Sequence, residues 1–296
     1  MPLPREISSL PLTNSQQKSL TEKGIQIVSE ISNSSPDVEF NIEELTKAPE
    51  TKIASQLLME EKSMRDINSF LDNLDVLLKG VLRPGLVTEF VGLPGSGRTQ
   101  LCLHLSVSAQ IIDDSLYGVT IYICSNLDFS ITRLREIIGN YKKSVKCFKD
   151  YDETVILKNI QFIDIMSSDQ LLECLEFLNE FGKEHKNITL VIIDSITYPL
   201  RLCESNEKTS LICFIITELR NLAKKYNFSV VMTNDMTTIV GSSGNEVVPS
   251  LRDTFYHMIN NRILLSQKDN IFEAEILKAS TKFPVKCNYK FLDDVT

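Results

Sequence analysis

Residues 90–100 have the sequence FVGLPGSGRTQ, which follows the G-x-x-x-x-G-[KR]-[ST] spacing of a phosphate-binding loop. In such a loop the glycines let successive backbone N–H groups turn toward phosphate oxygens, and the hydroxyl of Thr99 can hold Mg²⁺. An apolar run, LVTEF, precedes the loop, and an amphipathic run, LCLHLSVSAQII, follows it, as the strand–loop–helix motif requires. The residues predicted to bind nucleotide here are Gly92, Leu93, Pro94, Gly95, Ser96, Gly97, Arg98, Thr99 and Gln100.

A second acidic element follows further along the chain. Four apolar residues, LVII, lead to Asp194, which we place at the carboxyl end of a buried strand. An aspartate in that position is often only a helix cap or a turn residue. Together with the loop, however, it predicts a carboxylate that holds Mg²⁺ or its water with Thr99. The expected cofactors are therefore ATP and Mg²⁺.

Short β-rich apolar runs alternate with helical runs from residue 85 onward. The predicted strands are LVTEFV, VTIYI, IQFIDI, ITLVIID and FSVVMT, and the predicted helices lie at 99–112, 130–140, 168–184 and 209–225. This alternation predicts an α/β fold, a doubly wound and mostly parallel twisted sheet that places ligands at the carboxyl ends of its strands. After residue 260 three strand-like runs indicate an antiparallel C-terminal extension. We assign residues 81–296 to this core.

The N-terminal part of the chain has a different pattern. Residues 8–31 predict a helix that Gly24 stops and a second helix from about Ile25. A small all-α domain is therefore expected over residues 1–48.

Residues 49–80 are expected to form a linker and the start of the core. Within them, residues 51–64 have helical spacing, with Ile53, Leu57 and Leu58 on one face and the charges elsewhere. Such a helix is either a spacer or an arm that docks a partner.

Composition limits the class of protein. The 31 basic and 39 acidic residues give a net charge of −8, which works against strong independent binding to nucleic acid. Seven cysteines form no CxxC pair and lie mostly in apolar runs, which is typical of core thiols in a reducing compartment. No segment approaches the roughly 18 apolar residues of a membrane span, so no membrane association is expected.

Three segments, TEFVGLPGSGRTQLCLHL, LVIIDSITYPLR and VVMTNDMTT, resemble the eukaryotic RecA-type recombinases, and specifically the paralogs that assist the strand-exchange recombinase. Among these the chain is most similar to paralog C, called spindle-D in flies, and paralog D is the alternative because its DSN strand end resembles CSN here. The resemblance covers nearly the whole chain. It implies a RecA-like P-loop ATPase core preceded by a small all-α domain.

The resemblance also implies roles for individual residues. Arg133 matches an arginine that stacks on adenine, although an arginine one turn into a helix is usually solvated. Asn234 matches a sensor asparagine. DNA would be contacted by the segments after DSITYPLRL and NDMTT. The first region contains Arg201 and Lys208, whereas the second, TTIVGSSGNEVV, has no basic residue, and its SSG run is also typical of a flexible surface loop.

Three positions depart from the family pattern. Asn126 stands where the family has the glutamate that positions the attacking water, and an amide cannot take a proton. Arg98 replaces the phosphate-binding lysine, and Asp235 replaces a glutamine. Because losing such a contact typically costs about 10²–10⁴-fold, we expect nucleotide binding without efficient turnover. No catalytic residue is assigned.

The resemblance implies an ATP-binding subunit of a heteromeric paralog complex that acts in double-strand break repair and meiotic homologous recombination. Its partners would be other recombinase paralogs, the recombinase itself and, weakly, DNA. It would act in the nucleus, and also be present in the cytoplasm. The alternatives are an active DNA-stimulated ATPase, a chain whose Arg98 fills the nucleotide pocket, and a RecA-fold regulator outside recombination.

Overall fold

The structure is a computed structural model. The residues that it describes are 6–7, 18, 20–27, 51–126, 129–201, 203, 205–241, 244–251, 253–269, 271–280 and 285–292. The chain divides into two compact units, Met1–Lys62 and Ser63–Thr296. The expected three-part division at residues 48 and 80 stays a prediction.

In the N-terminal unit, residues 20–22 are helical and Gly24 follows with φ of 75°, a left-handed conformation that ends the helix. The backbone N–H of Ile25 donates to the carbonyl oxygen of Leu20 at 3.1 Å. Ile27 forms an antiparallel bridge with Glu6, so the expectation of a second helix starting at Ile25 is wrong for residues 25–27. The rest of that predicted helix lies outside the described residues.

The predicted linker helix is confirmed as α4 (Ala54–Ser63), which buries none of its residues. Its apolar side chains are largely exposed, with exposed fractions of 51% for Leu58 and 71% for Met59, and Ile53, which directly precedes the helix, is 64% exposed. Whether this helix is a spacer or a docking arm stays open, since its exposed apolar face fits both expectations.

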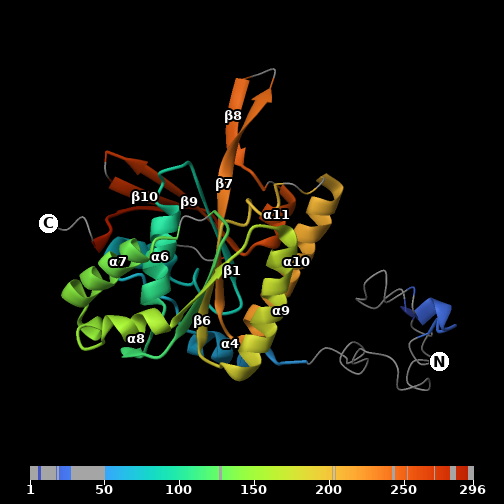
Figure 1. Ribbon diagram of the computed structural model, residues 1–296, viewed down its shortest axis with the longest axis horizontal. Coiled ribbons are helices and arrows are strands. Elements are labelled where there is room, and N and C mark those ends of the chain that lie inside the picture. Colours follow the sequence, from blue (N-terminus) through green and yellow to red (C-terminus); the bar gives the residue numbers. More distant parts are fainter. Residues whose placement is uncertain are drawn as a thin grey trace. The chain divides into compact units, whose positions relative to one another are not determined.

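The core unit is built on a nine-stranded sheet in the order β11-β10-β9-β1-β7-β6-β4-β5, with β8 paired to β7 alone (Figure 1). Its strands are β1 (Val87–Gly92), β4 (Val119–Cys124), β5 (Ile160–Asp164), β6 (Ile188–Asp194), β7 (Ser229–Gly241), β8 (Gly244–Pro249), β9 (Asn261–Lys268), β10 (Ile271–Lys278) and β11 (Lys286–Tyr289). Strands β9, β1, β7, β6, β4 and β5 are mutually parallel, and β10 and β11 are antiparallel additions. A separate hairpin joins β2 (Ile111–Ile112) to β3 (Ser115–Leu116). The expected mostly parallel sheet with an antiparallel extension is confirmed.

Helices cover both faces of this sheet (Figure 1). They are α5 (Asp72–Leu78), α6 (Arg98–Ser108), α7 (Ile131–Ser144), η2 (Lys146–Phe148), α8 (Glu153–Lys158), α9 (Ser168–Glu184), α10 (Ser205–Tyr226) and α11 (Asp253–Met258). Successive side chains of β4 point to opposite faces of the sheet. Tyr122 is in the hydrophobic cluster that contains residues of α6 and α7, whereas Ile121 is in the cluster that contains residues of α9 and α10. This two-sided burial explains the continuous apolar runs of the central strands. Among the described helices, none has the length and apolar character needed to cross a membrane.

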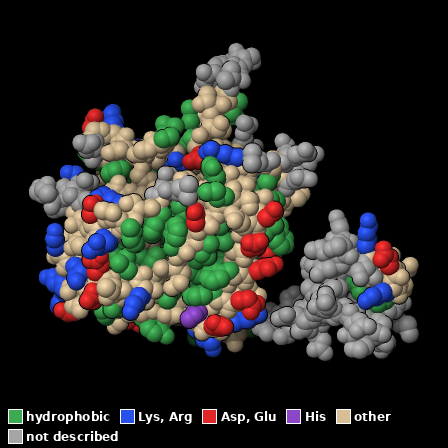
Figure 2. Space-filling view, viewed as in Figure 1, with side chains coloured by type: hydrophobic (Ala, Val, Ile, Leu, Met, Phe, Trp, Pro, Cys, Tyr) green, Lys and Arg blue, Asp and Glu red, His purple; other side chains and the backbone are tan. Residues whose placement is uncertain are grey.

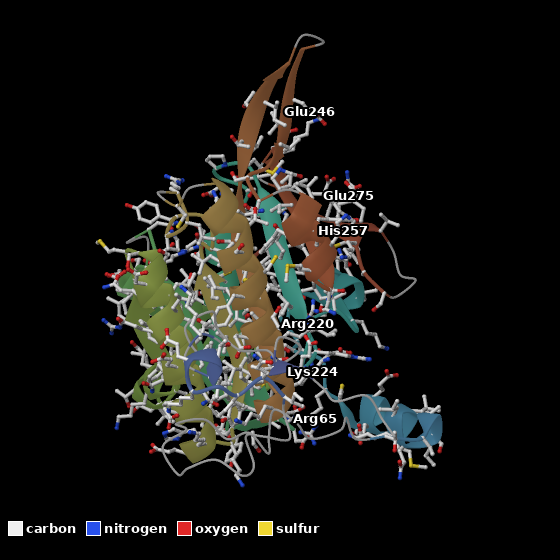
Figure 3. All side chains as sticks on the ribbon, turned by 90° about the vertical axis from the view of Figure 1, so that its right-hand side faces the viewer. Arg65, Arg220, Lys224, Glu246, His257 and Glu275 are labelled. Atoms are coloured by element: carbon white, nitrogen blue, oxygen red, sulfur yellow. The ribbon has the colours of Figure 1, made fainter. Side chains whose placement is uncertain are left out.

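The second segment expected to contact DNA, TTIVGSSGNEVV, contributes to a β-hairpin. Met236 to Gly241 of β7 pair in antiparallel register with β8, and they pair with no other described strand. The resulting hairpin projects from the carboxyl edge of the sheet, with Glu246 on its side (Figure 3). The TTIV and EVVP runs are rich in β-branched residues, which favour strands. Ser242 and Ser243 of the SSG run, for which a flexible surface loop is expected, lie outside the described residues.

The cysteines are core thiols only in part, since four of the seven are half-buried. All seven are free, and Cys102, Cys124 and Cys174 are buried. Burial raises the pKa of Cys174 to about 11, so this thiol stays protonated and unreactive at neutral pH.

Candidate nucleotide-binding site

The glycine-rich loop turns from the end of β1 into α6. Gly95 and Gly97 have φ values of 82° and 86°, the left-handed region that only glycine enters without strain. A side chain on Gly97 would also place its Cβ 2.8 Å from Cε1 of Phe272. Two independent constraints therefore require the glycines that the motif predicts.

The loop residues differ in exposure. Leu93, Pro94 and Gly95 are exposed, whereas Gly97, Thr99 and Gln100 are half-buried. The Oγ of Ser96 is buried and has no hydrogen-bond partner among the described residues. An unpartnered hydroxyl at the N-terminus of an eleven-residue helix suits an anion such as phosphate. The loop therefore has the groups that a nucleotide phosphate needs.

Asp194 ends β6, as predicted, and is only 3% exposed. Its Oδ2 accepts a hydrogen bond from Tyr122 Oη at 2.8 Å, and its Oδ1 accepts one from Thr233 Oγ1 at 2.5 Å. Burial first, and then the negative charge of Asp194, raises the pKa of Tyr122, so the tyrosine stays a donor. Each carboxylate oxygen keeps a lone pair that could bind a metal ion or its water. Because β1 and β6 both run parallel to β7, Asp194 and the loop lie at the same edge of the sheet.

The side chain of Arg98 turns toward the middle of β7, where the pairing of this strand with β1 ends. Its Nη1 donates to the carbonyl oxygen of Asn234 at 2.9 Å and to Oδ1 of Asp235 at 2.8 Å. The two charged side chains are 13% and 28% exposed, so water screens their ion pair only in part. The cation that replaces the family's lysine is thus paired with the carboxylate that replaces the family's glutamine.

Asp235 joins two further groups to this pair. Its Oδ2 accepts hydrogen bonds from Thr197 Oγ1 at 2.8 Å and from Arg201 Nη2 at 3.3 Å. Burial alone would raise the pKa of Asp235. The hydrogen bonds from Arg98 and Thr197, with the charges of Arg98 and Arg201, nevertheless bring it below its usual value. Asp235 is therefore ionised at neutral pH and neutralises part of the positive charge of the loop.

Replacing Asp235 by asparagine is expected to lower the free energy of unfolding at pH 7 by about 1 to 3 kcal/mol, the usual range for hydrogen bonds to charged groups. The folded-state pKa lies below the unfolded one, so the unfolded chain binds the proton first as pH falls. The deficit should therefore persist down to about pH 5 and shrink below about pH 4. Urea unfolding across this range measures it, with Asp150→Asn on the exposed surface as the control. A deficit that does not change with pH would contradict the ion pair.

Asn126 lies after the end of β4, where the family's glutamate is expected. Its Oδ1 is 2.9 Å from Ser125 Oγ and accepts a hydrogen bond from the backbone N–H of Ser195 at 3.3 Å. The amide oxygen is thus directed toward the end of β6. An amide in this position can orient a water molecule but cannot remove its proton.

Asn234 uses its side chain in the core. Its Nδ2 donates to Glu89 Oε1 at 2.6 Å, and its Oδ1 accepts from the backbone N–H of Leu251 at 3.3 Å. Its backbone carbonyl accepts from Arg98 of the phosphate-binding loop, whereas the hydrogen bonds of its side chain go to Glu89 and Leu251. Its predicted role as a sensor of nucleotide stays a prediction, and it would require the side chain to leave these partners.

Glu89 of β1 and Arg262 of β9 form a buried ion pair next to the site, between two neighbouring strands of the sheet. The sequence analysis did not predict this pair. The two residues are in register, are 0% and 6% exposed, and contact through Nε and Nη2 of the arginine. Burial raises the pKa of Glu89, although Arg262 and Asn234 oppose this shift. Single charged residues within the apolar runs VTEFV and NRILL were the available signal.

The three remaining predicted residues, Arg133, Arg201 and Lys208, make no direct hydrogen bond to the phosphate-binding loop in the described structure. Nη1 of Arg133 pairs with Glu136 at 2.9 Å along the surface of α7, so its contact with adenine stays a prediction. Arg201 lies over the ring of Tyr198, 5.2 Å from the centroid, as well as near Asp235. Lys208 is within α10, which begins at Ser205, and not in the loop that we expected.

Comparison with known proteins gives the family. A family model described as Rad51 matches residues 61–266. Two proteins named DNA repair protein RAD51 homolog 3 are each 27% identical to the chain. The one from Dictyostelium discoideum aligns over 72% of this chain and 60% of its own length, and the one from Cricetulus griseus over 94% and 88%. A DNA repair protein XRCC3 homolog from Arabidopsis thaliana is 27% identical over 72% of this chain and 79% of its own length.

These matches confirm the resemblance to the RecA-type recombinase paralogs and the α/β core that it implies. The choice between paralog C and paralog D stays a prediction. The family match covers the glycine-rich loop, Asn126, Asp194 and Asp235, and therefore every residue of the candidate site at the carboxyl edge of the sheet. This chain belongs to the Rad51 family.

Proposed function

We propose that this chain is an ATP-binding subunit of a heteromeric complex of recombinase paralogs, and that it hydrolyses ATP weakly or not at all. The complex would assist the strand-exchange recombinase in double-strand break repair and in meiotic recombination. The relatives are named as DNA repair proteins, which supports a role in recombination repair. Nuclear action, with some of the protein in the cytoplasm, follows from that role.

The support for nucleotide binding is the chemistry of the loop. Left-handed glycines, the N-terminus of α6 and the unpartnered Ser96 hydroxyl provide donors for phosphate oxygens. Thr99 and Asp194 are the residues that would hold Mg²⁺, an ion that neutralises phosphate charge when it is bound. The residues present therefore fit ATP and Mg²⁺.

The observation that carries the proposal of weak turnover is the pairing of Arg98 with Asp235. A phosphate-binding cation stabilises the transition state through charge that it directs at the phosphoryl group. Here the carboxylate of Asp235 takes part of that charge, and Thr197 and Arg201 hold the carboxylate in place. Asn126, as an amide, provides no base to compensate.

ATP binding and hydrolysis by the purified chain test this proposal. We expect the native chain to bind ATP with Mg²⁺ and to turn it over negligibly. The double variant Arg98→Lys with Asn126→Glu should gain about tenfold or more in turnover, because it restores the lysine and the carboxylate at the two positions. Adding Asp235→Gln should increase the gain, since the new lysine then has no carboxylate to pair with.

Thr99→Val is the control, because it removes the hydroxyl offered to Mg²⁺ and should weaken Mg²⁺-dependent binding. Robust turnover by the native chain would contradict the inactive-subunit proposal. Absence of ATP binding by the native chain would instead mean that Arg98 and Asp235 close the loop to phosphate. Co-purification with recombinase paralogs tests the complex separately.

A further inference from the structure

A cluster of lysines stands out on a chain with net charge −8. Residues 142–149, KKSVKCFK, contain four lysines and no acidic residue. Lys142 and Lys143 are in the last turn of α7, Lys146 begins η2 and Lys149 follows it directly. We call Lys142, Lys143, Lys146 and Lys149 the lysine cluster.

The lysine cluster is accessible, and its charges are compensated only in part, since Lys142 helps to lower the pKa of Asp152 after the hydrogen bonds from Thr154. Three of its members are exposed and Lys142 is half-buried. In the part of the chain that the structure describes, no ion pair joins any of the four to an acidic side chain.

Two of the four acidic residues near the cluster have other partners. Glu153 pairs with Arg135, and Asp152 caps α8 by accepting from the backbone N–H of Thr154. Asp150 is exposed next to Lys149, and Asp114 lies near Cys147. Over residues 131–158 as a whole, seven basic residues face four acidic ones. The local balance is therefore positive.

The cluster is held on a rigid support. Leu134, Ile137, Ile138 and Tyr141 bury the opposite face of α7. The fully buried Phe148 anchors η2 with its ring centroid 5.0 Å from that of Tyr141. Figure 2 shows Lys and Arg side chains, with some acidic ones among them, over the end of the core where Figure 1 places α7 and α8. The four ammonium groups thus belong to one region of the surface.

The segments expected to contact DNA offer little positive charge beyond Lys208, which is half-buried in α10. The β7–β8 hairpin has no Lys or Arg between residues 229 and 251. Arg201 is directed at Asp235, and Lys286 pairs with Glu273. Lys278 donates to the backbone oxygens of Tyr256 and Ile259. Since binding to a nucleic-acid backbone requires Lys or Arg at the phosphates, a further group of exposed lysines would add to the affinity of these segments.

We propose that the lysine cluster binds the phosphate backbone of DNA without base specificity, at a surface separate from the β7–β8 hairpin. This rests on the DNA repair role proposed above and adds a contact site to it. The charges on one rigid turn match the negative charge that recurs along a DNA backbone, and exposed lysines act as point charges toward phosphates. Their contribution to affinity should fall steeply with salt.

Fluorescence anisotropy with the full chain and a labelled 20-nucleotide single strand tests the proposal. The four lysines of the cluster are changed together to glutamine. A matched control changes Lys79, Lys186, Lys268 and Lys290, which are exposed elsewhere, and alters net charge equally. We expect the cluster variant to bind about tenfold or more weakly at 50 mM salt. The slope of log affinity against log salt should fall by about 2 to 3, and the control should change each value much less.

Equal losses in the two variants would overturn the proposal, because net charge alone would then account for them. Unchanged binding by the cluster variant, or no DNA binding by the native chain at 50 mM salt, would also overturn it. Loss of binding to vesicles with anionic lipids, with DNA binding retained, would assign the cluster to a membrane surface instead. ATP binding measured on the same preparations keeps this outcome distinct from failure of the proposed nucleotide role.

Discussion

Replacing Arg262 by methionine is expected to lower the free energy of unfolding by about 3 to 5 kcal/mol, the usual cost of breaking a buried ion pair from one side. The substitution leaves Glu89, which is fully buried, with Asn234 as its remaining side-chain donor. Burial already raises the pKa of Glu89, and loss of the guanidinium removes the main opposing influence. Because ionised Glu89 is then uncompensated, the deficit should be larger at pH 8 than at pH 5.

Urea unfolding of three variants separates the explanations. Arg262→Met combined with Glu89→Gln should recover most of the loss, since the pair becomes neutral and the amide oxygen can still accept from Asn234. Arg133→Met, which breaks the partly exposed pair with Glu136, should cost about 1 kcal/mol at most. If the single and double variants at Glu89 and Arg262 were equally unstable, lost packing of the arginine would be the cause.

Gly92→Ala is expected to destabilise the core by about 3 kcal/mol or more and to abolish nucleotide binding. The added Cβ would lie 2.3 Å from Ser96 Oγ and 2.4 Å from the carbonyl oxygen of Leu265. The serine can rotate, but the carbonyl belongs to β9, which pairs with β1 along its length. Relief therefore requires moving a strand or the loop, and overpacking of this kind costs about 1 to 3 kcal/mol even where side chains alone shift.

Thermal unfolding and ATP titration measure these two effects. Gly139→Ala is the matched control, because nothing lies within 4 Å of the added Cβ and the residue is inside α7. Alanine favours a helix interior over glycine by about 1 kcal/mol, so this control should be slightly stabilised. A Gly92→Ala protein as stable as the native chain would mean that β9 does not press against the loop.

Much of the fold could be predicted because its signals are local. The strand that ends at Gly92 and the helix that begins at Arg98 flank a glycine-rich segment. Glycines at this spacing indicate a tight turn between the two elements. Asp194 was found because a continuous apolar run ends at it, and a strand buried on both faces produces such a run. Alternation of strands and helices then indicated the order of a parallel sheet.

The partner of Arg98 could not be predicted in the same way. Arg98 and Asp235 are far apart in the sequence, and they meet only because β1 and β7 are neighbours with Gly92 in register with Asp235. The two departures from the family pattern looked independent, whereas the structure makes them one ion pair. The hydrogen bond from the side chain of Asn234 to Glu89 was not predictable for a related reason, since Glu89 lies on another strand.

The position of β1 has a consequence for synthesis of the chain. Its two neighbours in the sheet, β7 and β9, begin at residues 229 and 261, although β1 itself ends at residue 92. A nascent chain that has not reached these strands carries the glycine-rich motif on a strand whose backbone groups are unpaired. A messenger RNA truncated before the codon for residue 229 would therefore encode the glycine-rich motif without β7 or β9, the two strands that pair with β1. Its protein product would expose β1 as an unpaired apolar strand, which is prone to aggregation.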